Sequence, residues 1–156
     1  MNTGRNRIYA DTSVYGGTFD AEFERNSKAF FEQVASGRFH LLISPIVRDE
    51  VLKAPPAVRS LIEDIGTYAD FVPISESALR LQQAYLTAGI VGPKWEADAL
   101  HVAVVTVENC WAIVSWNFRH IVHFDKIALY NEVNTANGYS GIGIYSPSEV
   151  ISYGDD

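Results

Sequence analysis

The stretch Leu100–Ile121, LHVAVVTVENCWAIVSWNFRHI, joins an apolar helix to an apolar strand. Residues 96–108 are apolar on nearly every side of a helical wheel, which predicts a helix buried within the protein. Residues 111–115 show no alternation with polar residues, as is typical of a parallel strand covered on both faces. Polar residues stand at both ends of the stretch, with Asp98 shortly before it and Ser-Trp-Asn at 115–117. The apolar middle is therefore expected to carry polar groups to one edge of a sheet.

Short apolar runs alternate with helical segments along the rest of the chain. Strands are expected at residues 7–10, 39–43, 70–74, 111–115 and 144–145. Helices are expected to begin after residues 11–13 and at 146, and to cover 29–34, 46–54, 58–67, 75–88, 96–108 and 118–132. Because strands that alternate with helices make βαβ units, we predict an α/β fold, a three-layer α/β/α sandwich with a mainly parallel central sheet. In such sheets, ligands bind beyond the carboxyl ends of the strands.

The composition is typical of one compact domain, expected to span residues 1–156. Hydrophobic residues make up 47% of the chain and charged residues 20%, which is enough apolar surface for a sizeable core. Cys110 is the sole cysteine, so an internal disulfide is excluded and a reducing compartment is favoured. No signal-peptide pattern opens the sequence, and no apolar run reaches the length of a membrane span. These features predict a cytoplasmic protein that has no membrane partner.

The formal net charge of −7 limits the kinds of nucleic-acid-binding protein this can be. Affinity for phosphate comes largely from Lys and Arg, so a protein that coats nucleic acid through a broad positive field is disfavoured. A nuclease is still possible, because carboxylates that hold divalent metals contribute negative charge, and the bound metal reverses the local sign.

Three carboxylates are expected to meet at the ligand-binding edge of the sheet. Asp11 directly follows the first strand, where an aspartate can also serve as a helix N-cap. Glu50 falls within the apolar arc of its helix, and glutamate is rarely buried unless it is paired or binds a metal, although at the edge of the arc it could reach water. Asp98 opens the helix at 96–108, where an acid also complements the helix dipole. Each of these acids has a structural explanation beside the functional one.

Other polar residues near this edge are open to more than one interpretation. Ser115 and Asn117 lie just past the strand at 111–115, but serine and asparagine are common in any turn. His120 and His123 could bind zinc if a third ligand approached, yet the chain has no second cysteine and no His-Glu-x-x-His motif. His101 could orient a phosphate or simply fill space. A glycine-rich phosphate-binding loop is absent from the sequence.

Taken in order, these motifs resemble the PIN-domain family, and within it the VapC-type toxins of bacterial toxin–antitoxin systems. The matching pieces span nearly the whole chain: Asp11-Thr12-Ser13-Val14, Ser44-Pro45 with Glu50, Asp98-Ala99-Leu100-His101 with Ala103, Val114-Ser115-Trp116-Asn117-Phe118-Arg119-His120, and Ser146-Pro147 with Glu149. By this resemblance, Asp11, Glu50 and Asp98 are the metal-binding acids, and Ser115 is the small hydroxyl residue near the fourth acidic position. Many relatives carry Asp at that position, whereas this chain has the uncharged amide of Asn117, which leaves open whether one metal or two are bound.

The resemblance implies an endoribonuclease that uses Mg²⁺ or Mn²⁺. Mg²⁺ takes oxygen ligands and keeps several waters, so a few carboxylates suffice if the RNA phosphate supplies further ligands. The metal lowers the pKa of a bound water and neutralises charge on the phosphate oxygens. The expected catalytic residues are Asp11, Glu50, Asp98, Ser115 and Asn117, with the three acids as metal ligands, and the expected substrate contacts are Ser13 and Arg119.

Partner proteins are also implied by the resemblance. A small antitoxin would cover the acidic cleft, and the chain would form a homodimer. Tyr15, Phe19, Phe30 and Phe31 are candidates for such contacts if they are exposed, although aromatic residues at helical spacing also commonly belong to the core.

Two alternatives to the nuclease are compatible with the sequence. In a phosphatase or phosphotransferase, Asp11 would act as the nucleophile, but a second acid is usual two residues later, and here that residue is Ser13. A binding protein that keeps the fold but has lost catalysis is the other alternative, because Asn117 removes a charge from the site.

Overall fold

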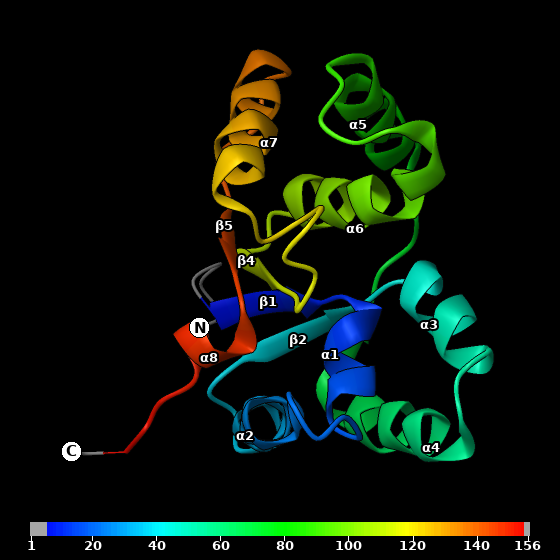
Figure 1. Ribbon diagram of the computed structural model, residues 1–156, viewed down its shortest axis with the longest axis vertical. Helices are drawn as coiled ribbons and strands as arrows, with labels where there is room; N and C mark the ends of the chain where they lie inside the picture. Colours follow the sequence, from blue (N-terminus) through cyan, green and yellow to red (C-terminus); the bar gives the residue numbers. More distant parts are fainter. Residues whose placement is uncertain (1–5, 155–156) are drawn as a thin grey trace.

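In the computed structural model, which describes residues 6–154, five parallel strands form one sheet (Figure 1). The strands are β1 (Arg7–Ala10), β2 (His40–Ile43), β3 (Ala69–Phe71), β4 (Ala112–Val114) and β5 (Gly143–Tyr145). Their order across the sheet is β3-β2-β1-β4-β5, so β1 lies at the centre. Tyr9 of β1 pairs with Leu42 on one side and Ile113 on the other. The carboxyl ends of all five strands therefore share one edge of the sheet.

Helices cover both faces of this sheet and form the outer layers of the predicted sandwich. The helices are α1 (Thr12–Gly17), α2 (Glu24–Ala35), α3 (Pro45–Leu52), α4 (Pro56–Ile65), α5 (Glu76–Thr87), α6 (Glu96–Val107), α7 (Phe124–Ala136) and α8 (Pro147–Val150), with 3-10 turns at Gly66–Tyr68 and Pro93–Trp95. In Figure 1, α5, α6 and α7 lie above the sheet, α2 and α4 lie below it, and α1 and α3 stand at the carboxyl ends of β1 and β2. The α/β sandwich predicted from the sequence is confirmed.

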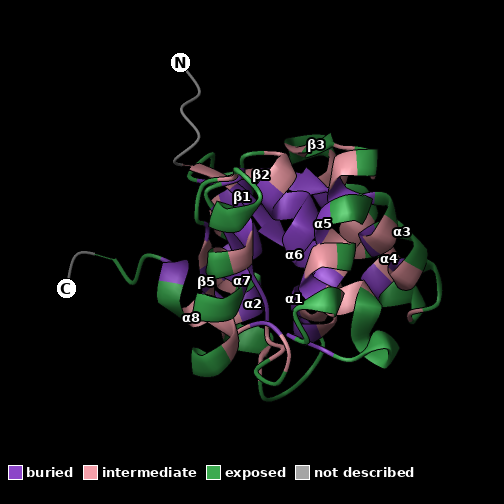
Figure 2. Cartoon of the chain, turned by 90° about the horizontal axis from the view of Figure 1, so that it is seen from above, coloured by how far each residue is buried: buried purple, intermediate pink, exposed green. Residues whose placement is uncertain are grey.

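The core runs through the stretch quoted first, as its apolar pattern predicted. All three residues of β4 are buried, and α6 is buried along the whole segment from Ala99 to Thr106 apart from Leu100 (Figure 2). The helix packs against the sheet on one side and against α5 on the other, so an apolar surface all round is what its position requires. Within residues 6–154, no helix combines the length and apolar character that a membrane crossing requires.

Side-chain caps fix the start of the two helices that follow β1 and β2. Asp11 caps α1, because its carboxylate accepts a hydrogen bond from the Ser13 backbone N–H. Ser44 caps α3, and Pro45 occupies the first turn, as predicted. Gly17 ends α1 where a Cβ would lie 2.6 Å from Ser27 Oγ, so only glycine lets α1 approach α2 this closely.

The predicted helix at 118–132 begins later than expected. Residues 118–122 form turns, and α7 starts at Phe124, with His123 as its N-cap. The reason is local: the Asn117 side-chain oxygen accepts hydrogen bonds from the N–H groups of Arg119 and His120, which stabilises a turn in place of a helix. The expectation that His120 and His123 lie on one helix is therefore also wrong, because His120 lies in this turn and His123 is the N-cap of α7.

Three of the four aromatic residues considered for partner contacts are buried. Tyr15, Phe30 and Phe31 pack in the core, where the rings of Tyr15 and Phe31 lie 4.8 Å apart. Phe19 is the exception, with 53% of its surface exposed. The expectation of exposed contacts was therefore wrong for the first three residues, because α1 and α2 turn these side chains toward the sheet.

Candidate active site

Asp11 lies at the carboxyl end of β1 and is almost fully buried, with 4% of its surface exposed. Its Oδ1 accepts hydrogen bonds from the backbone N–H of Ser13 at 3.1 Å and from the Ser13 hydroxyl at 2.5 Å. Its Oδ2 accepts a hydrogen bond from the Ser115 hydroxyl at 2.7 Å. Both serines are held in turn by backbone N–H groups, those of Trp116 and Asn117 respectively. The loop after β4 therefore sets the orientation of the Asp11 carboxylate.

Burial is the largest influence on Asp11 and raises the pKa of its carboxyl group. The neighbouring His101 imidazole and the two serine hydroxyls lower the pKa, and the negative charge of Asp98 raises it again. The net direction is upward, although the carboxylate accepts three hydrogen bonds. The charged form of Asp11 is thus held in an environment that disfavours it.

Glu50 reaches the same region from α3. Its Oε1 accepts a hydrogen bond from the Thr12 hydroxyl at 2.5 Å and contacts His101 Nε2 at 3.0 Å. Burial by itself raises the pKa of Glu50, but its interactions with the His101 imidazole and the hydrogen bond from Thr12 outweigh that effect, so the pKa is lowered. The side chain is 39% exposed, which places the glutamate at the edge of the apolar arc and gives it access to solvent.

Asp98 lies in the first turn of α6, and its side chain is 21% exposed. Burial raises the pKa of this carboxyl group, while the neighbouring imidazoles of His120 and His101 and an interaction with the Asn117 side chain lower it. The charge of Glu50 raises it again, and the net direction is upward. His120 Nδ1 lies 3.1 Å from Asp98 Oδ2, and the His120 ring stacks on Trp95 at a centroid distance of 4.3 Å.

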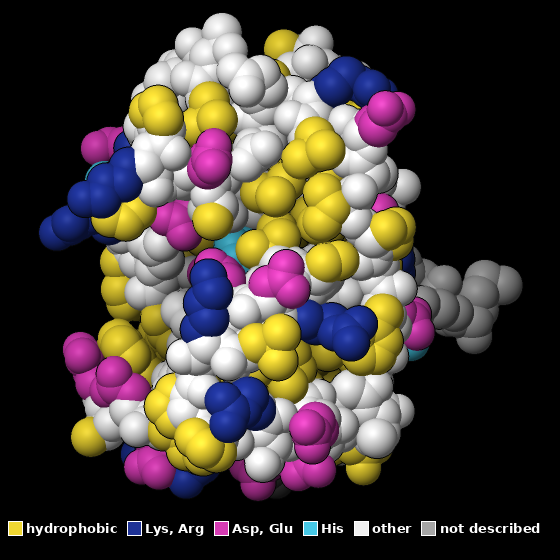
Figure 3. Space-filling model, turned by 90° about the vertical axis from the view of Figure 1, so that its right-hand side faces the viewer, with side chains coloured by type: hydrophobic (Ala, Val, Ile, Leu, Met, Phe, Trp, Pro, Cys, Tyr) yellow, Lys and Arg dark blue, Asp and Glu magenta, His cyan; other side chains and the backbone are white. Residues whose placement is uncertain are grey.

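The three acids therefore form one electrostatic group. The charge of Asp98 acts on Asp11, the charge of Glu50 acts on Asp98, and the buried imidazole of His101 influences all three. Figure 3 shows this side of the molecule: a histidine side chain is visible in a central hollow, with acidic side chains beside it and hydrophobic groups around it. The three acids thus act on one another electrostatically, and their role as metal ligands stays a prediction.

A hard dication fits this donor set. Carboxylate oxygens are the ligands that Mg²⁺ and Mn²⁺ prefer, and a dication would stabilise the ionised forms of Asp11 and Asp98, whose pKa values are raised first by burial and then by a neighbouring acid. Within residues 6–154, no three acidic, imidazole or thiol side chains stand close enough to enclose an ion by themselves. Mg²⁺ does not require such a cage, since it is usually bound by one or two carboxylates together with waters and substrate phosphate. The hydrogen bonds to Glu50 are both made to Oε1, so Oε2 remains for another ligand.

The remaining predicted site residues differ in their accessibility. Ser115 is fully buried, and Ser13 is half-buried; both hydroxyls donate to Asp11. The Asn117 amide oxygen accepts two backbone hydrogen bonds and so stabilises the turn that follows β4. Arg119 is exposed on the same turn. The roles of these residues toward a metal or RNA stay predictions.

The two histidines considered for zinc have separate partners. His120 faces Asp98, whereas His123 Nδ1 accepts a hydrogen bond from the Asp125 backbone N–H at the start of α7. Their imidazoles therefore have different structural tasks.

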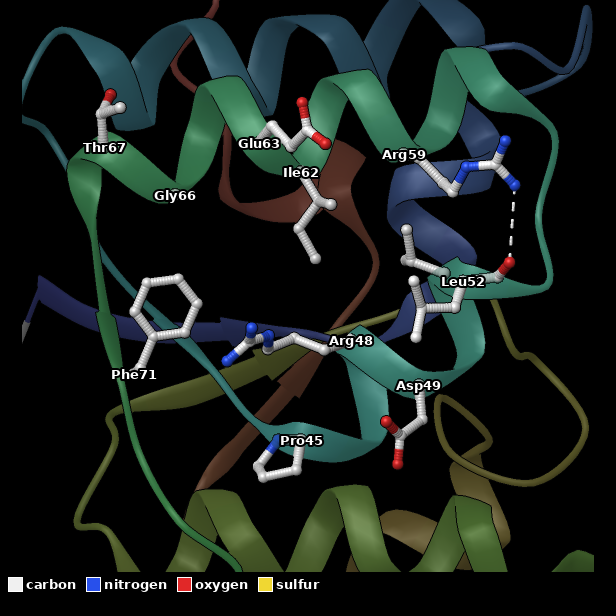
Figure 4. Close-up of a pocket in the computed structure, with 11 residues that line it drawn as sticks. Pro45, Arg48, Asp49, Leu52, Arg59, Ile62, Glu63, Gly66, Thr67 and Phe71 are labelled. Carbon is white, nitrogen blue, oxygen red and sulfur yellow. Dashed lines mark hydrogen bonds between the residues drawn. The ribbon is translucent and has the colours of Figure 1, made fainter.

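Two pockets lie away from the acids. One, of about 510 Å³, opens between α3, α4 and the end of β3, and Arg48, Arg59, Ile62 and Phe71 are among its lining residues (Figure 4). Another, of about 430 Å³, is lined by parts of α2 and α4 and by the segment after α1, which includes the exposed Phe19. In Figure 4, Asp49 and Arg48 point away from one another along α3, with Arg48 directed toward Phe71. Neither pocket contains the three candidate metal ligands.

Several contacts of the site were missed when the sequence was read. Thr12 and Tyr9 looked like ordinary cap and strand residues, and His120 was considered only as a zinc ligand. A signal was present in the spacing, since Thr12 directly follows Asp11, and Tyr9 is two residues before it on the same strand face. What the sequence could not supply was the packing of α3 and α6 against that end of β1.

Comparisons with known proteins agree with this architecture. No family model and no curated protein sequence matches the chain. In the crystal structure of VapBC2 from Rickettsia felis bound to a DNA fragment from its promoter, a chain superposes with a TM-score of 0.53 at 17% identity, over 72% of this chain and 89% of that one. Mycobacterium tuberculosis VapC20, a toxin that cleaves the sarcin–ricin loop, superposes with a TM-score of 0.57 at 13% identity, over 87% of this chain and 98% of that one. The chain has the fold of these toxin structures, as the sequence resemblance predicted.

Proposed function

We propose that this protein is a metal-dependent endoribonuclease that hydrolyses RNA phosphodiester bonds, and that it is the toxin of a toxin–antitoxin pair. The proposal rests on three acids, Asp11, Glu50 and Asp98, that are each influenced by the buried His101 near the carboxyl ends of the strands. Fold likeness to VapC20, which cleaves RNA, supports the same reaction class. An electrostatically strained carboxylate group at a sheet edge is typical of a functional site.

The side chains of the site have distinct tasks in this proposal. Asp11 and Asp98 hold the metal, and Glu50 holds it directly or through a water. Ser13 and Ser115 orient Asp11, while His120 orients Asp98. Mg²⁺ or Mn²⁺, when bound, would supply a water of lowered pKa and neutralise charge on the phosphate oxygens. Arg119, exposed beside the site, would contact the RNA backbone.

A phosphatase that uses Asp11 as a nucleophile is less well supported by the geometry. The position two residues later, where such enzymes usually carry an acid, is occupied by Ser13, which donates to Asp11.

The second alternative, a catalytically inactive binding protein, is favoured by one observation, the position of the Asn117 side chain. The Asn117 oxygen is engaged by backbone N–H groups, so the fourth acidic position of the family supplies neither charge nor a free oxygen. We therefore propose a site built on one metal ion, in which Asn117 stabilises the turn beside Asp98.

Incubation of the purified protein with structured RNA and Mn²⁺ tests the proposed activity, with Asp11→Asn as the control. Cleavage by the wild-type protein that requires Mn²⁺ and disappears in the variant is the expected result. An equal, metal-independent signal from both proteins would count against the nuclease, and phosphorylation trapped on Asp11 would favour the phosphatase.

The proposal includes a small antitoxin and a homodimer. Support for an antitoxin comes from the likeness to a VapBC2 chain and from exposed hydrophobic residues at the two pockets, among them Phe19 and Phe71. Copurification of the chain with the product of a neighbouring gene, and its loss on Phe19→Ser substitution, would support the antitoxin. Sedimentation of the isolated chain would measure its oligomeric state.

A further inference from the structure

A chain of hydrogen bonds runs from the start of α3 through β1 and α6 to Glu50. The Tyr9 hydroxyl lies 2.7 Å from Ser44 Oγ and 2.7 Å from His101 Nδ1. The other ring nitrogen of the histidine, Nε2, lies 3.0 Å from Glu50 Oε1. Tyr9 and Ser44 are fully buried, and His101 is 2% exposed, so water does not compete for these contacts. The links join residues that are 35, 92 and 51 positions apart in sequence.

The two ends of this chain allow one continuous direction of hydrogen bonds through it. At one end, the Val47 backbone N–H points at Ser44 Oγ and can only donate. At the other end, the Glu50 carboxylate carries no hydrogen and can only accept. Between these ends, each hydrogen finds one acceptor if Ser44 donates to Tyr9, Tyr9 donates to Nδ1 of His101, and Nε2–H donates to Glu50.

Glu50 receives a second donor on the same oxygen atom. The Thr12 hydroxyl donates to Oε1 at 2.5 Å, so Oε1 is held by groups from α1 and α6. Two donors on one oxygen fix the rotation of the carboxylate, and Oε2 is left to face another ligand. The half-exposed glutamate would otherwise be free to move among several rotamers.

We propose that Tyr9, Ser44 and His101 are positioning residues, which hold the imidazole as its Nε2–H tautomer so that Glu50 presents Oε2 to the metal. The proposal rests on the proposed function, in which Glu50 is a ligand of that metal. Partners of metal ligands commonly act in this way, and their loss reduces metal affinity or activity about 10- to 100-fold.

The tautomer can be measured without any assay of catalysis. Long-range proton–nitrogen NMR correlations of the protein labelled with ¹⁵N-histidine distinguish a protonated from an unprotonated ring nitrogen. In the wild-type protein at neutral pH, His101 is expected to carry its proton on Nε2 alone. In Tyr9→Phe, Nε2–H still faces Glu50 while Nδ1 loses its donor, so the proton is expected to stay on Nε2 and the Nδ1 resonance to shift toward that of an unbonded nitrogen. A proton on Nδ1 in the wild-type protein, or an Nδ1 resonance unchanged by Tyr9→Phe, would overturn the proposal.

Mn²⁺ affinity, measured by calorimetry, tests the consequence for Glu50. Tyr9→Phe is expected to weaken Mn²⁺ binding about 10-fold. Tyr85→Phe is the matched control, because it also removes one buried hydroxyl but one that bonds Asn134, away from the acids. Equal Mn²⁺ affinities of the two Tyr→Phe variants would contradict the role assigned to Tyr9.

A pair of substitutions at His101 separates positioning from packing. His101→Gln can still donate an N–H to Glu50 and is expected to keep Mn²⁺ affinity within about 3-fold, whereas His101→Leu is expected to lose 10-fold or more. Equal affinities of two folded variants would overturn the proposal, and if His101→Leu does not fold, the Tyr9→Phe measurements decide. If the wild-type protein binds Mn²⁺ as expected but cuts no RNA, the proposed activity fails while the positioning role stands. If it cuts RNA but His101 carries its proton on Nδ1, the positioning role fails while the proposed activity stands.

Discussion

Two buried polar clusters in this protein differ in one respect, the presence of charge. The acidic cluster, Asp11, Glu50 and Asp98 with their partners, lies at the carboxyl end of the sheet. The neutral cluster, Tyr85, Thr106, Asn131 and Asn134, joins α5, α6 and α7. There the Tyr85 hydroxyl donates to Asn134 and lies 3.3 Å from Thr106 Oγ1. Asn134 donates to the Asn131 side-chain oxygen at 3.2 Å, and Asn131 bonds the backbone of Ile142 in both directions.

The difference lies in what each cluster contributes to stability. The neutral cluster satisfies its donors and acceptors within the fold, so it contributes stability and orders the helices. The acidic cluster is also well bonded, yet burial and neighbouring charges raise the pKa of Asp11 and Asp98, so their ionised forms weaken the fold at neutral pH. Residues that cost stability are expected where function requires them.

The largest expected effect is on activity, from Asp11→Asn. Asparagine can cap α1 as well as aspartate does, so the fold is kept while the charge is lost. RNA cleavage is expected to fall by about 10³-fold, because the charge stabilisation that depends on the metal is worth several kcal/mol. Initial rates of RNA cleavage at saturating Mn²⁺ measure this. If the variant retained more than about a tenth of the wild-type activity, Asp11 would not be a metal ligand of the active site.

Glu50→Gln is expected to have the next largest effect, a loss of about 10²-fold in cleavage rate. The amide removes one negative charge and one strong ligand from the acidic cluster. Asp49→Asn is the matched control, because it removes one charge from the neighbouring exposed position of the same helix. Equal rates for the two variants would mean that only the overall charge matters, contrary to the role given to Glu50.

A substitution in the neutral cluster is expected to lower stability and to leave the cleavage rate nearly unchanged. Tyr85→Phe leaves the Asn134 oxygen without its donor, so the free energy of unfolding should fall by roughly 1–3 kcal/mol. The cleavage rate is expected to stay within about 2-fold of the wild-type value at temperatures where the variant is folded. Urea unfolding gives the free energy of unfolding, and an assay on the same sample gives the cleavage rate. A loss of activity without a loss of stability would contradict the purely structural role of the neutral cluster.

A smaller effect, of about 1 kcal/mol, is expected on the pH dependence of stability. Because the pKa of Asp11 is raised in the folded state, its protonated form favours folding, and this contribution is lost as the pH rises through the folded-state pKa. Asp11→Asn should therefore match the wild-type protein near the ordinary aspartate pKa of 3.8 and become the more stable of the two as the pH rises to 7. A variant that is less stable than wild type at pH 7 would show that the charge is not strained.

The sequence indicated the fold and the candidate acids, whereas it did not indicate the hydrogen-bond partners of those acids. Apolar runs identified the parallel strands and the buried helix α6, because period and composition are local properties. Asp11, Glu50 and Asp98 were found because each is an acid at an edge or in an apolar arc. The hydrogen bonds from Thr12, Tyr9 and His120 depend on how distant helices pack, which periodicity does not encode. The late start of α7 was missed because the Asn117 side chain competes with the helix for backbone N–H groups.

A crystal structure of the protein soaked with Mn²⁺ tests the central claim most directly, since anomalous scattering locates the ion. We predict one Mn²⁺ peak in contact with oxygens of Asp11 and Asp98 and within direct or water-mediated reach of Glu50 Oε2, at ligand distances close to the roughly 2.1 Å typical of Mg²⁺. The account would be contradicted if the ion bound elsewhere, or if the acids stayed paired with serine and histidine and no ion bound at saturating Mn²⁺.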